Sequence, residues 1–134
     1  MNKQIAALAT DQSNIVMWDI DALLSDCKDR PYITVDTNSL VPQSWLSIDT
    51  KYALTTNVDT PIILFELPDG QFYVADGNHR LYRAVTEGVQ KMNVIVIPEN
   101  EHLSYLFNST PEIYSRVIDG LKDEGIFISN FIKG

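Results

Sequence analysis

The chain is poor in cysteine, histidine and basic residues. Its 134 residues include one cysteine, two histidines, and ten lysines or arginines against eighteen aspartates or glutamates, for a formal net charge of -8. The single Cys27 cannot form an internal disulfide, and two widely separated histidines match no zinc-binding spacing, so we expect no metal site. The shortage of cations excludes broad attraction to DNA or to an anionic membrane, because that attraction scales with the number of neutralised phosphates.

The sequence also has no long apolar run, no internal repeat and no linker rich in proline and glycine. The first residues, MNKQIAALATDQ, contain neither the apolar segment of a signal peptide nor a stretch that could span a bilayer. We therefore expect a cytoplasmic protein that makes no membrane contact. Apolar residues make up 45% of the chain, which is enough for one hydrophobic core, so residues 1–134 are expected to form a single domain.

Four segments rich in β-branched and aromatic residues are predicted strands. They are 32–36 (YITVD), 61–67 (PIILFEL), 71–76 (QFYVAD) and 92–98 (MNVIVIP). The turn sequence PDG joins the second and third segments, so these two are expected to form a hairpin.

Apolar spacings of three and four, together with capping residues, predict helices around these strands. The expected helices are one carrying Ile20, Leu23, Leu24 and Cys27 behind an Asp19 or Asp21 cap, one over 78–87 before Gly88, a piece in EHLSYLF, and one from Thr110 and Pro111 to Gly125. Between 37 and 60 we expect loops, with a helical turn around Trp45. The order of elements predicts an α+β fold, a small mixed sheet with helices on one side.

The segment 74–85, VADGNHRLYRAV, concentrates cations in this acidic chain. A strand that ends at Gly77 and a helix that begins at Asn78 would present backbone N–H groups without internal partners, and these groups attract anions. Gly77 has no Cβ to obstruct an approaching anion. Arg80 and Arg83 can add charge-assisted hydrogen bonds to phosphate oxygens. This pattern predicts a phosphate-binding helix start.

The same residues also permit a purely structural interpretation. Asp76 can cap the helix and pair with Arg80, Arg83 can pair with Glu87 at i,i+4, and His79 can be an ordinary surface residue. Spacing alone does not decide between this interpretation and the phosphate site.

The segment PIILFELPDGQFYVADGNHRLYRAVTEGVQKMNVIVIPE resembles the core of the ParB/sulfiredoxin superfamily. That core has a strand beginning with proline, its hairpin partner, a Gly-x-(His/Arg)-Arg motif opening a helix, and a closing apolar strand. The matching residues are Gly77, His79, Arg80 and Ala84, with Pro61, the Asp69-Gly70 turn and the 94–98 strand around them. The resemblance covers about 32–99 and leaves 100–134 as C-terminal helices. It implies a ParB/sulfiredoxin-like fold, with the mixed sheet flanked by helices.

The resemblance also implies a nucleotide site at 77–80, filled by ATP, ADP or CTP with Mg²⁺, and phosphotransferase or nucleotide-hydrolysing activity. Asn78 stands where sulfiredoxins carry their catalytic cysteine, so reduction of a sulfinic acid is not expected. The segment after Glu99 is too short for the DNA-binding and dimerisation parts of a partitioning ParB, so specific DNA binding is not expected either. The Asp-Gly-x-His-Arg form is similar to that of free-serine kinases.

Three residues are candidates for catalysis if the site turns over its ligand. Asp76 could hold Mg²⁺ or orient His79, and Asp36 could act as a general base. Asp36 has an alternative role as a turn residue at the end of a strand. His79 could donate to a phosphate near neutral pH. His102 is expected on an exposed helical face.

Two other functions remain open from the sequence. The first is a non-enzymatic, regulatory protein whose acidic surface binds a basic protein partner. The second and weaker is a DNA nuclease, since the superfamily is often described as nuclease-like. The leading hypothesis is a protein that binds a nucleotide or another phosphorylated small molecule.

Overall fold

Residues 4–10, 14–45, 47–129 and 131 are described by the computed structural model of this chain. In this part of the chain, six strands form one sheet of two strands and one of four. The strands are β1 (Ile5–Ala9), β2 (Ile15–Asp19), β3 (Ile33–Asp36), β4 (Ile62–Glu66), β5 (Phe72–Asp76) and β6 (Lys91–Ile97). The helices are α1 (Ile20–Cys27), α2 (Thr50–Ala53), α3 (Asn78–Thr86), α4 (Glu99–His102) and α5 (Pro111–Leu121), with 3-10 turns at Thr37–Leu40, Pro68–Gly70 and Leu103–Tyr105.

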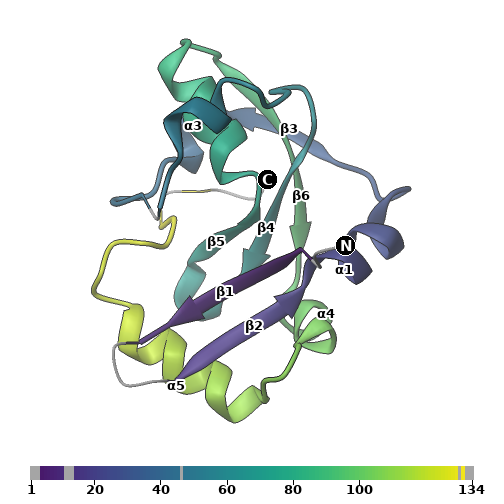
Figure 1. Ribbon diagram of the computed structural model, residues 1–134, viewed down its shortest axis with the longest axis vertical. Coiled ribbons are helices and arrows are strands. Elements are labelled where there is room, and N and C mark those ends of the chain that lie inside the picture. The colour runs from purple at the N-terminus through teal and green to yellow at the C-terminus, as the bar shows by residue number, and fades with distance from the viewer. Residues whose placement is uncertain (1–3, 11–13, 46, 130, 132–134) are drawn as a thin grey trace.

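The larger sheet is mixed, with the order β3-β6-β4-β5 (Figure 1). β4 runs parallel to β6, whereas β5 pairs antiparallel with β4 and β3 pairs antiparallel with β6. The predicted hairpin is the β4–β5 pair, whose connecting turn places Asp69 at a left-handed φ of 65°. The mixed sheet flanked by helices confirms the predicted α+β class.

β4 separates two hydrophobic cores. Ile63 and Phe65 belong to the core beneath the β1–β2 hairpin, α1 and α5, whereas Ile62 and Leu64 belong to the core beneath α3. This division follows from the alternation of side chains along a strand. Because both faces of the sheet are covered, β4 is apolar and buried from Ile62 to Phe65, and the prediction of helices on one side only is wrong.

The β1–β2 hairpin lies across one face of the larger sheet (Figure 1). Its inward side chains are buried and alternate with more exposed ones; they are Ala6, Leu8, Val16 and Trp18. Neither strand was predicted. The β1 sequence IAALA is rich in alanine, which is depleted in strands, so its pattern carries no strand signal.

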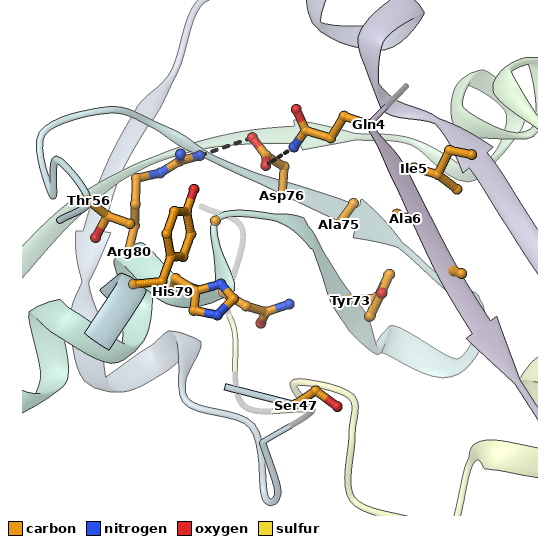
Figure 2. A pocket seen from close by; sticks show the side chains of 14 residues that line it. Gln4, Ile5, Ala6, Ser47, Thr56, Tyr73, Ala75, Asp76, His79 and Arg80 are labelled. Carbon is orange, nitrogen blue, oxygen red and sulfur yellow. Dashed lines mark hydrogen bonds and ion pairs between the residues drawn. The ribbon is translucent and has the colours of Figure 1, made fainter. Parts of the chain in front are cut away.

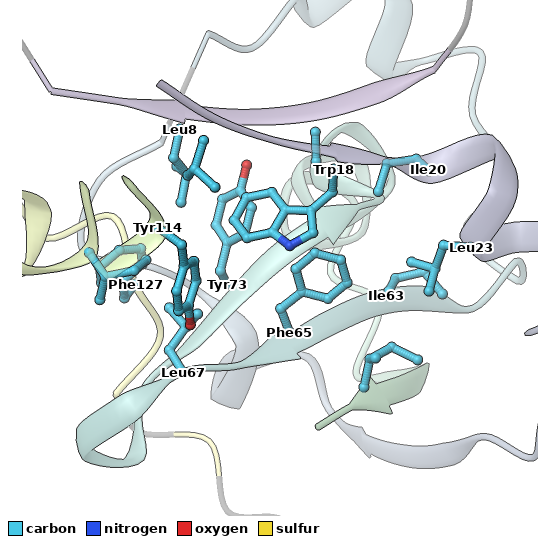
Figure 3. Packing of buried hydrophobic residues seen from close by; sticks show 14 of the residues in the cluster. Leu8, Trp18, Ile20, Leu23, Ile63, Phe65, Leu67, Tyr73, Tyr114 and Phe127 are labelled. Atoms are coloured by element: carbon cyan, nitrogen blue, oxygen red, sulfur yellow. The ribbon is translucent and has the colours of Figure 1, made fainter. Parts of the chain in front are cut away.

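Trp18 lies at the centre of the core under the hairpin (Figure 3). Its ring is fully buried and packs edge-on against Phe65, with 5.1 Å between the ring centroids. His102 stacks on the same Phe65 ring at 4.4 Å and is also fully buried, so the prediction of an exposed His102 is wrong. α4 is a short turn directly after β6, and it directs the imidazole inward, where Nε2 donates to the Glu66 carbonyl at 2.9 Å.

Other sequence predictions differ from the structure in detail. Trp45 lies outside the helices and packs edge-on against Tyr82, while the helical turns of the 37–60 segment fall at Thr37–Leu40 and Thr50–Ala53. α5 has the predicted Thr110 cap but ends at Leu121, and Ile128 then exchanges backbone hydrogen bonds with Phe72 of β5. Residues 130 and 132–134 of the predicted C-terminal helical segment lie outside the described residues. Among the described helices, none is both long and apolar enough to cross a bilayer.

Candidate functional site

The junction between β5 and α3 depends on a glycine. Gly77 is the N-cap residue of α3 and has a φ of 109°, a left-handed value that side chains with a Cβ rarely adopt. A Cβ at this position would come within 2.8 Å of the Ile62 Cβ and closer still to its Cγ2. Gly77 is therefore required by the packing of the junction on β4, in addition to any role in ligand approach.

The start of α3 has no side-chain cap. Asp76 does not cap the helix, in contrast to the structural interpretation of the sequence. The Asn78 side chain donates to the Val74 carbonyl at 3.2 Å, and the first backbone bond of the helix runs from Leu81 N–H to the Gly77 carbonyl. The N–H groups of the first turn therefore have no partner inside the helix, and the residues of this turn line a cavity.

Asp76 lies between two hydrogen-bond donors (Figure 2). Arg80 Nη2 donates to Asp76 Oδ2 at 3.0 Å, and Gln4 Nε2 donates to Asp76 Oδ1 at 2.8 Å. Arg80 Nη2 also donates to the Pro61 carbonyl at 3.2 Å. The ion pair predicted by the structural interpretation is thus present, and it fixes the guanidinium at the edge of the cavity.

His79 faces α2 rather than Asp76. Its Nε2 accepts a hydrogen bond from the Asp49 backbone N–H at 3.1 Å, and Tyr52 packs edge-on against the imidazole with 4.8 Å between ring centroids. This geometry therefore does not support the prediction that Asp76 orients His79. With Nε2 accepting, Nδ1 carries the proton of the neutral ring and is the atom left to donate to a ligand.

The cavity at the start of α3 has a volume of about 530 Å³. It lies between β1, the end of β5, α2 and the first turn of α3. The predicted site residues that line it are Asp76, Gly77, Asn78, His79 and Arg80. The size is within the range of small-molecule sites.

Two predicted site residues lie elsewhere. Asp36 is exposed at the end of β3, where its carboxylate accepts from Lys91 Nζ at 2.6 Å, and it lines a different hollow beside the far end of α3. Arg83 donates to the Thr56 carbonyl and pairs with Glu87 at 3.0 Å, and it does not line the cavity. Asp36 as a general base and Arg83 as a phosphate ligand are therefore not supported by this arrangement.

The structure adds residues that the sequence did not single out. Gln4, Ser47, Tyr52 and Thr56 line the cavity from segments with no motif. No pattern in the sequence could have found them, because the hairpin and α2 approach α3 only in the folded chain. Within the described ranges, no group of three or more His, Cys, Asp or Glu side chains could hold a metal ion, so Mg²⁺ would enter only with a ligand that supplies oxygen atoms.

Comparison of the chain with protein-family models, with curated proteins and with solved structures finds no match.

Proposed function

We propose that the protein binds the phosphate group of a nucleotide or another phosphorylated small molecule at the first turn of α3. The observation that carries the proposal is the uncapped helix start at Gly77, which opens into a cavity beside His79 and Arg80. Unpaired N–H groups and the positive end of the helix dipole favour an anion at this position.

The charges around the cavity support an anion held locally. The carboxylate that lines it, Asp76, is neutralised by Arg80, and both side chains are mostly buried, at 14% and 17% exposure. A phosphate at the helix start would therefore meet a guanidinium, an imidazole and backbone N–H groups without an unpaired carboxylate beside it. The net charge of -8 on the whole chain does not act against this, since exposed charges beyond about 10 Å are screened.

The resemblance of the motif to the ParB/sulfiredoxin superfamily supports a nucleotide as the ligand. The elements β4, β5, α3 and β6 follow one another in the order that this resemblance implies. On this basis ATP, ADP and CTP, each with Mg²⁺, are the first ligands to test. The proposal concerns binding, because both Asp76 oxygens already accept hydrogen bonds and Asp36 lies at a different hollow.

The test is isothermal titration calorimetry with tripolyphosphate, ATP, ADP and CTP, with and without Mg²⁺. We expect Arg80→Gln to weaken binding by about tenfold to a hundredfold, as expected for the loss of a charge-assisted hydrogen bond of about 1.5–3 kcal/mol. Arg83→Gln is the matched control, because Arg83 is on the same helix and is also paired at i,i+4, but lies outside the cavity. We expect it to leave the affinity unchanged.

A second variant controls for the possibility that Arg80→Gln lowers affinity by disturbing the fold. His79→Gln removes the imidazole without disturbing the Asp76–Arg80 pair, and we expect it to weaken phosphate binding as well. The proposal is wrong if the native protein binds none of the four ligands, or if Arg80→Gln and His79→Gln bind them as tightly as Arg83→Gln does.

A further inference from the structure

A second cavity, of about 610 Å³, adjoins the first. The two share one rim, formed by Gln4, Tyr52, Asp76 and Arg80. Figure 2 shows the hydrogen bonds from Gln4 and Arg80 to Asp76. Because all three residues line both cavities, these bonds lie at the boundary where the two cavities meet. A ligand that passes over this boundary would contact both.

The two cavities differ in their chemistry. The first is lined by the polar start of α3, whereas the second extends between α1 and the sheet and has mainly apolar walls. The apolar part of the walls is formed by Leu24, Cys27, Tyr32, Pro61, Ile63 and Ile95, and the polar residues Lys28, Asp29 and Thr60 also line this cavity. Arg30, which also lines the second cavity, is ion-paired with Glu101, so its charge is already neutralised.

We propose that the second cavity binds an uncharged, apolar ring of the same ligand whose phosphate lies at the start of α3. This inference rests on the proposed function and specifies its ligand as a nucleotide-like molecule, with a ring joined to a phosphate by a hydroxylated linker. A free phosphate or polyphosphate would leave the apolar cavity unused, and burial of a ring there removes apolar surface from water.

The shared rim is suited to the linker. Gln4 supplies an amide oxygen and Tyr52 a phenol, and each Asp76 oxygen, which already accepts one hydrogen bond, has a second lone pair that can accept from a hydroxyl. Gln4 is itself held in place, because its backbone N–H donates to Asp21 Oδ2 at 3.0 Å and its carbonyl accepts from Ile20 N–H at 3.0 Å. The rim is therefore an ordered group of donors and acceptors between a polar and an apolar cavity.

Cys27 provides a probe of the second cavity, because it is the only cysteine in the chain and lines that cavity. Its thiol can be modified with methyl methanethiosulfonate, a small neutral reagent, and the rate followed by mass spectrometry. Burial raises the pKa of the thiol, so the reaction is run at alkaline pH, where enough thiolate forms. ATP or CTP at about ten times its Kd is expected to slow modification by about tenfold, because about one molecule in eleven remains free. Tripolyphosphate at the same occupancy is expected to leave the rate unchanged.

A cavity-filling variant gives an independent readout. Leu24→Trp places a larger side chain in the second cavity, whereas Ser25→Trp introduces the same indole at an exposed neighbouring position of α1 outside it. We expect Leu24→Trp to raise the Kd for ATP or CTP by about tenfold, toward the Kd for tripolyphosphate, and to leave tripolyphosphate binding unchanged. Ser25→Trp is expected to change neither.

The outcomes separate this inference from the proposed function. If tripolyphosphate and the nucleotides all fail to bind, the proposed function is wrong and this inference falls with it. If the nucleotides bind but neither protect Cys27 nor respond to Leu24→Trp, the phosphate site stands and the inference about the second cavity is overturned.

Discussion

Arg80 and Asp76 form an ion pair of 3.0 Å across the start of α3, the position where an incoming phosphate would lie. On the proposed function, a phosphate would compete with this carboxylate for the same guanidinium. Asp76 thus has two opposing effects, since it holds Arg80 in place and also competes for its charge. Substitutions at Asp76 can separate these effects.

Asp76→Asn is predicted to tighten phosphate binding and to destabilise the fold. The amide removes a negative charge from the edge of the cavity, so we expect the Kd for tripolyphosphate to fall by about threefold to tenfold. It also weakens two hydrogen bonds to a mostly buried group, which is expected to lower the free energy of unfolding by about 1–3 kcal/mol. Calorimetry and urea denaturation measure the two quantities.

Asp36→Asn is the control for this prediction. Asp36 also pairs with a cation, Lys91, but both side chains are more than half exposed, so we expect a loss of at most about 1 kcal/mol and no change in affinity. If Asp76→Asn binds tripolyphosphate more weakly than the native protein, the proposed competition for Arg80 is wrong.

Gly77→Ala is predicted to be strongly destabilising. The alanine would have a left-handed backbone, at a cost of about 1–2 kcal/mol, and its Cβ would overlap Ile62. We expect a total loss of about 3 kcal/mol or more, measured by urea denaturation. Gly88→Ala isolates the backbone effect, because Gly88 has a φ of 73° and its Cβ would meet nothing within 4 Å. Equal losses in the two variants would show that contact with Ile62 has no effect.

The stability of the protein is predicted to fall in mild acid because of His102. Burial lowers the pKa of His102, despite the opposing effect of the Glu66 carbonyl, so the unfolded chain takes up a proton before the folded one does. Stability is therefore full above the ordinary histidine pKa of 6.5 and decreases as the pH falls below it toward the lower folded value. The slope approaches about 1.4 kcal/mol per pH unit, measurable by urea denaturation at several pH values.

His102→Gln tests the assignment of this slope. Glutamine can still donate to the Glu66 carbonyl but does not titrate, so we expect a flatter profile between about pH 6.5 and pH 5, whatever its absolute stability. Glu99 and Tyr114 lie near His102, and the Tyr114 hydroxyl donates to Glu99 at 2.8 Å. Burial raises the pKa of Tyr114, so the tyrosine does not titrate in this range. The same slope in both proteins would assign the pH dependence to other groups.

Trp18→Ala is predicted to destabilise the whole domain. Trp18 joins the hairpin to the sheet and is fully buried, so its truncation is expected to cost about 3–5 kcal/mol. Ile15→Ala, on the same strand but 45% exposed, is expected to change stability by less than about 1 kcal/mol. We expect one cooperative transition in urea by both fluorescence and circular dichroism. A separate early transition in the Trp18 variant would show that the hairpin is not part of the common core.

Much of the central fold could be predicted from local sequence. The apolar run of β4, the Pro68–Gly70 turn, α3 with Gly88 behind it, and the Thr110 cap of α5 each carry their own signal, because propensity and capping depend on neighbouring residues. The hairpin and the burial of His102 could not be predicted, because they result from packing between distant segments. For the same reason, the sequence could not predict that Gln4 and Tyr52 line the candidate site or that a second cavity adjoins it.

The sequence by itself determined that a strand ends at Asp76, that a glycine follows it and that a helix begins at Asn78. These features arise from backbone preferences over a few neighbouring residues. Only the tertiary structure decided what surrounds that start. In the folded chain, β1 and α2 flank the start of α3, and Arg80 pairs with Asp76. Arg83 and Asp36 lie outside the cavity, and a polar and an apolar cavity share one rim. The physical reason is that these contacts join residues far apart in the chain, and burial of the two cores on either side of β4 sets their positions.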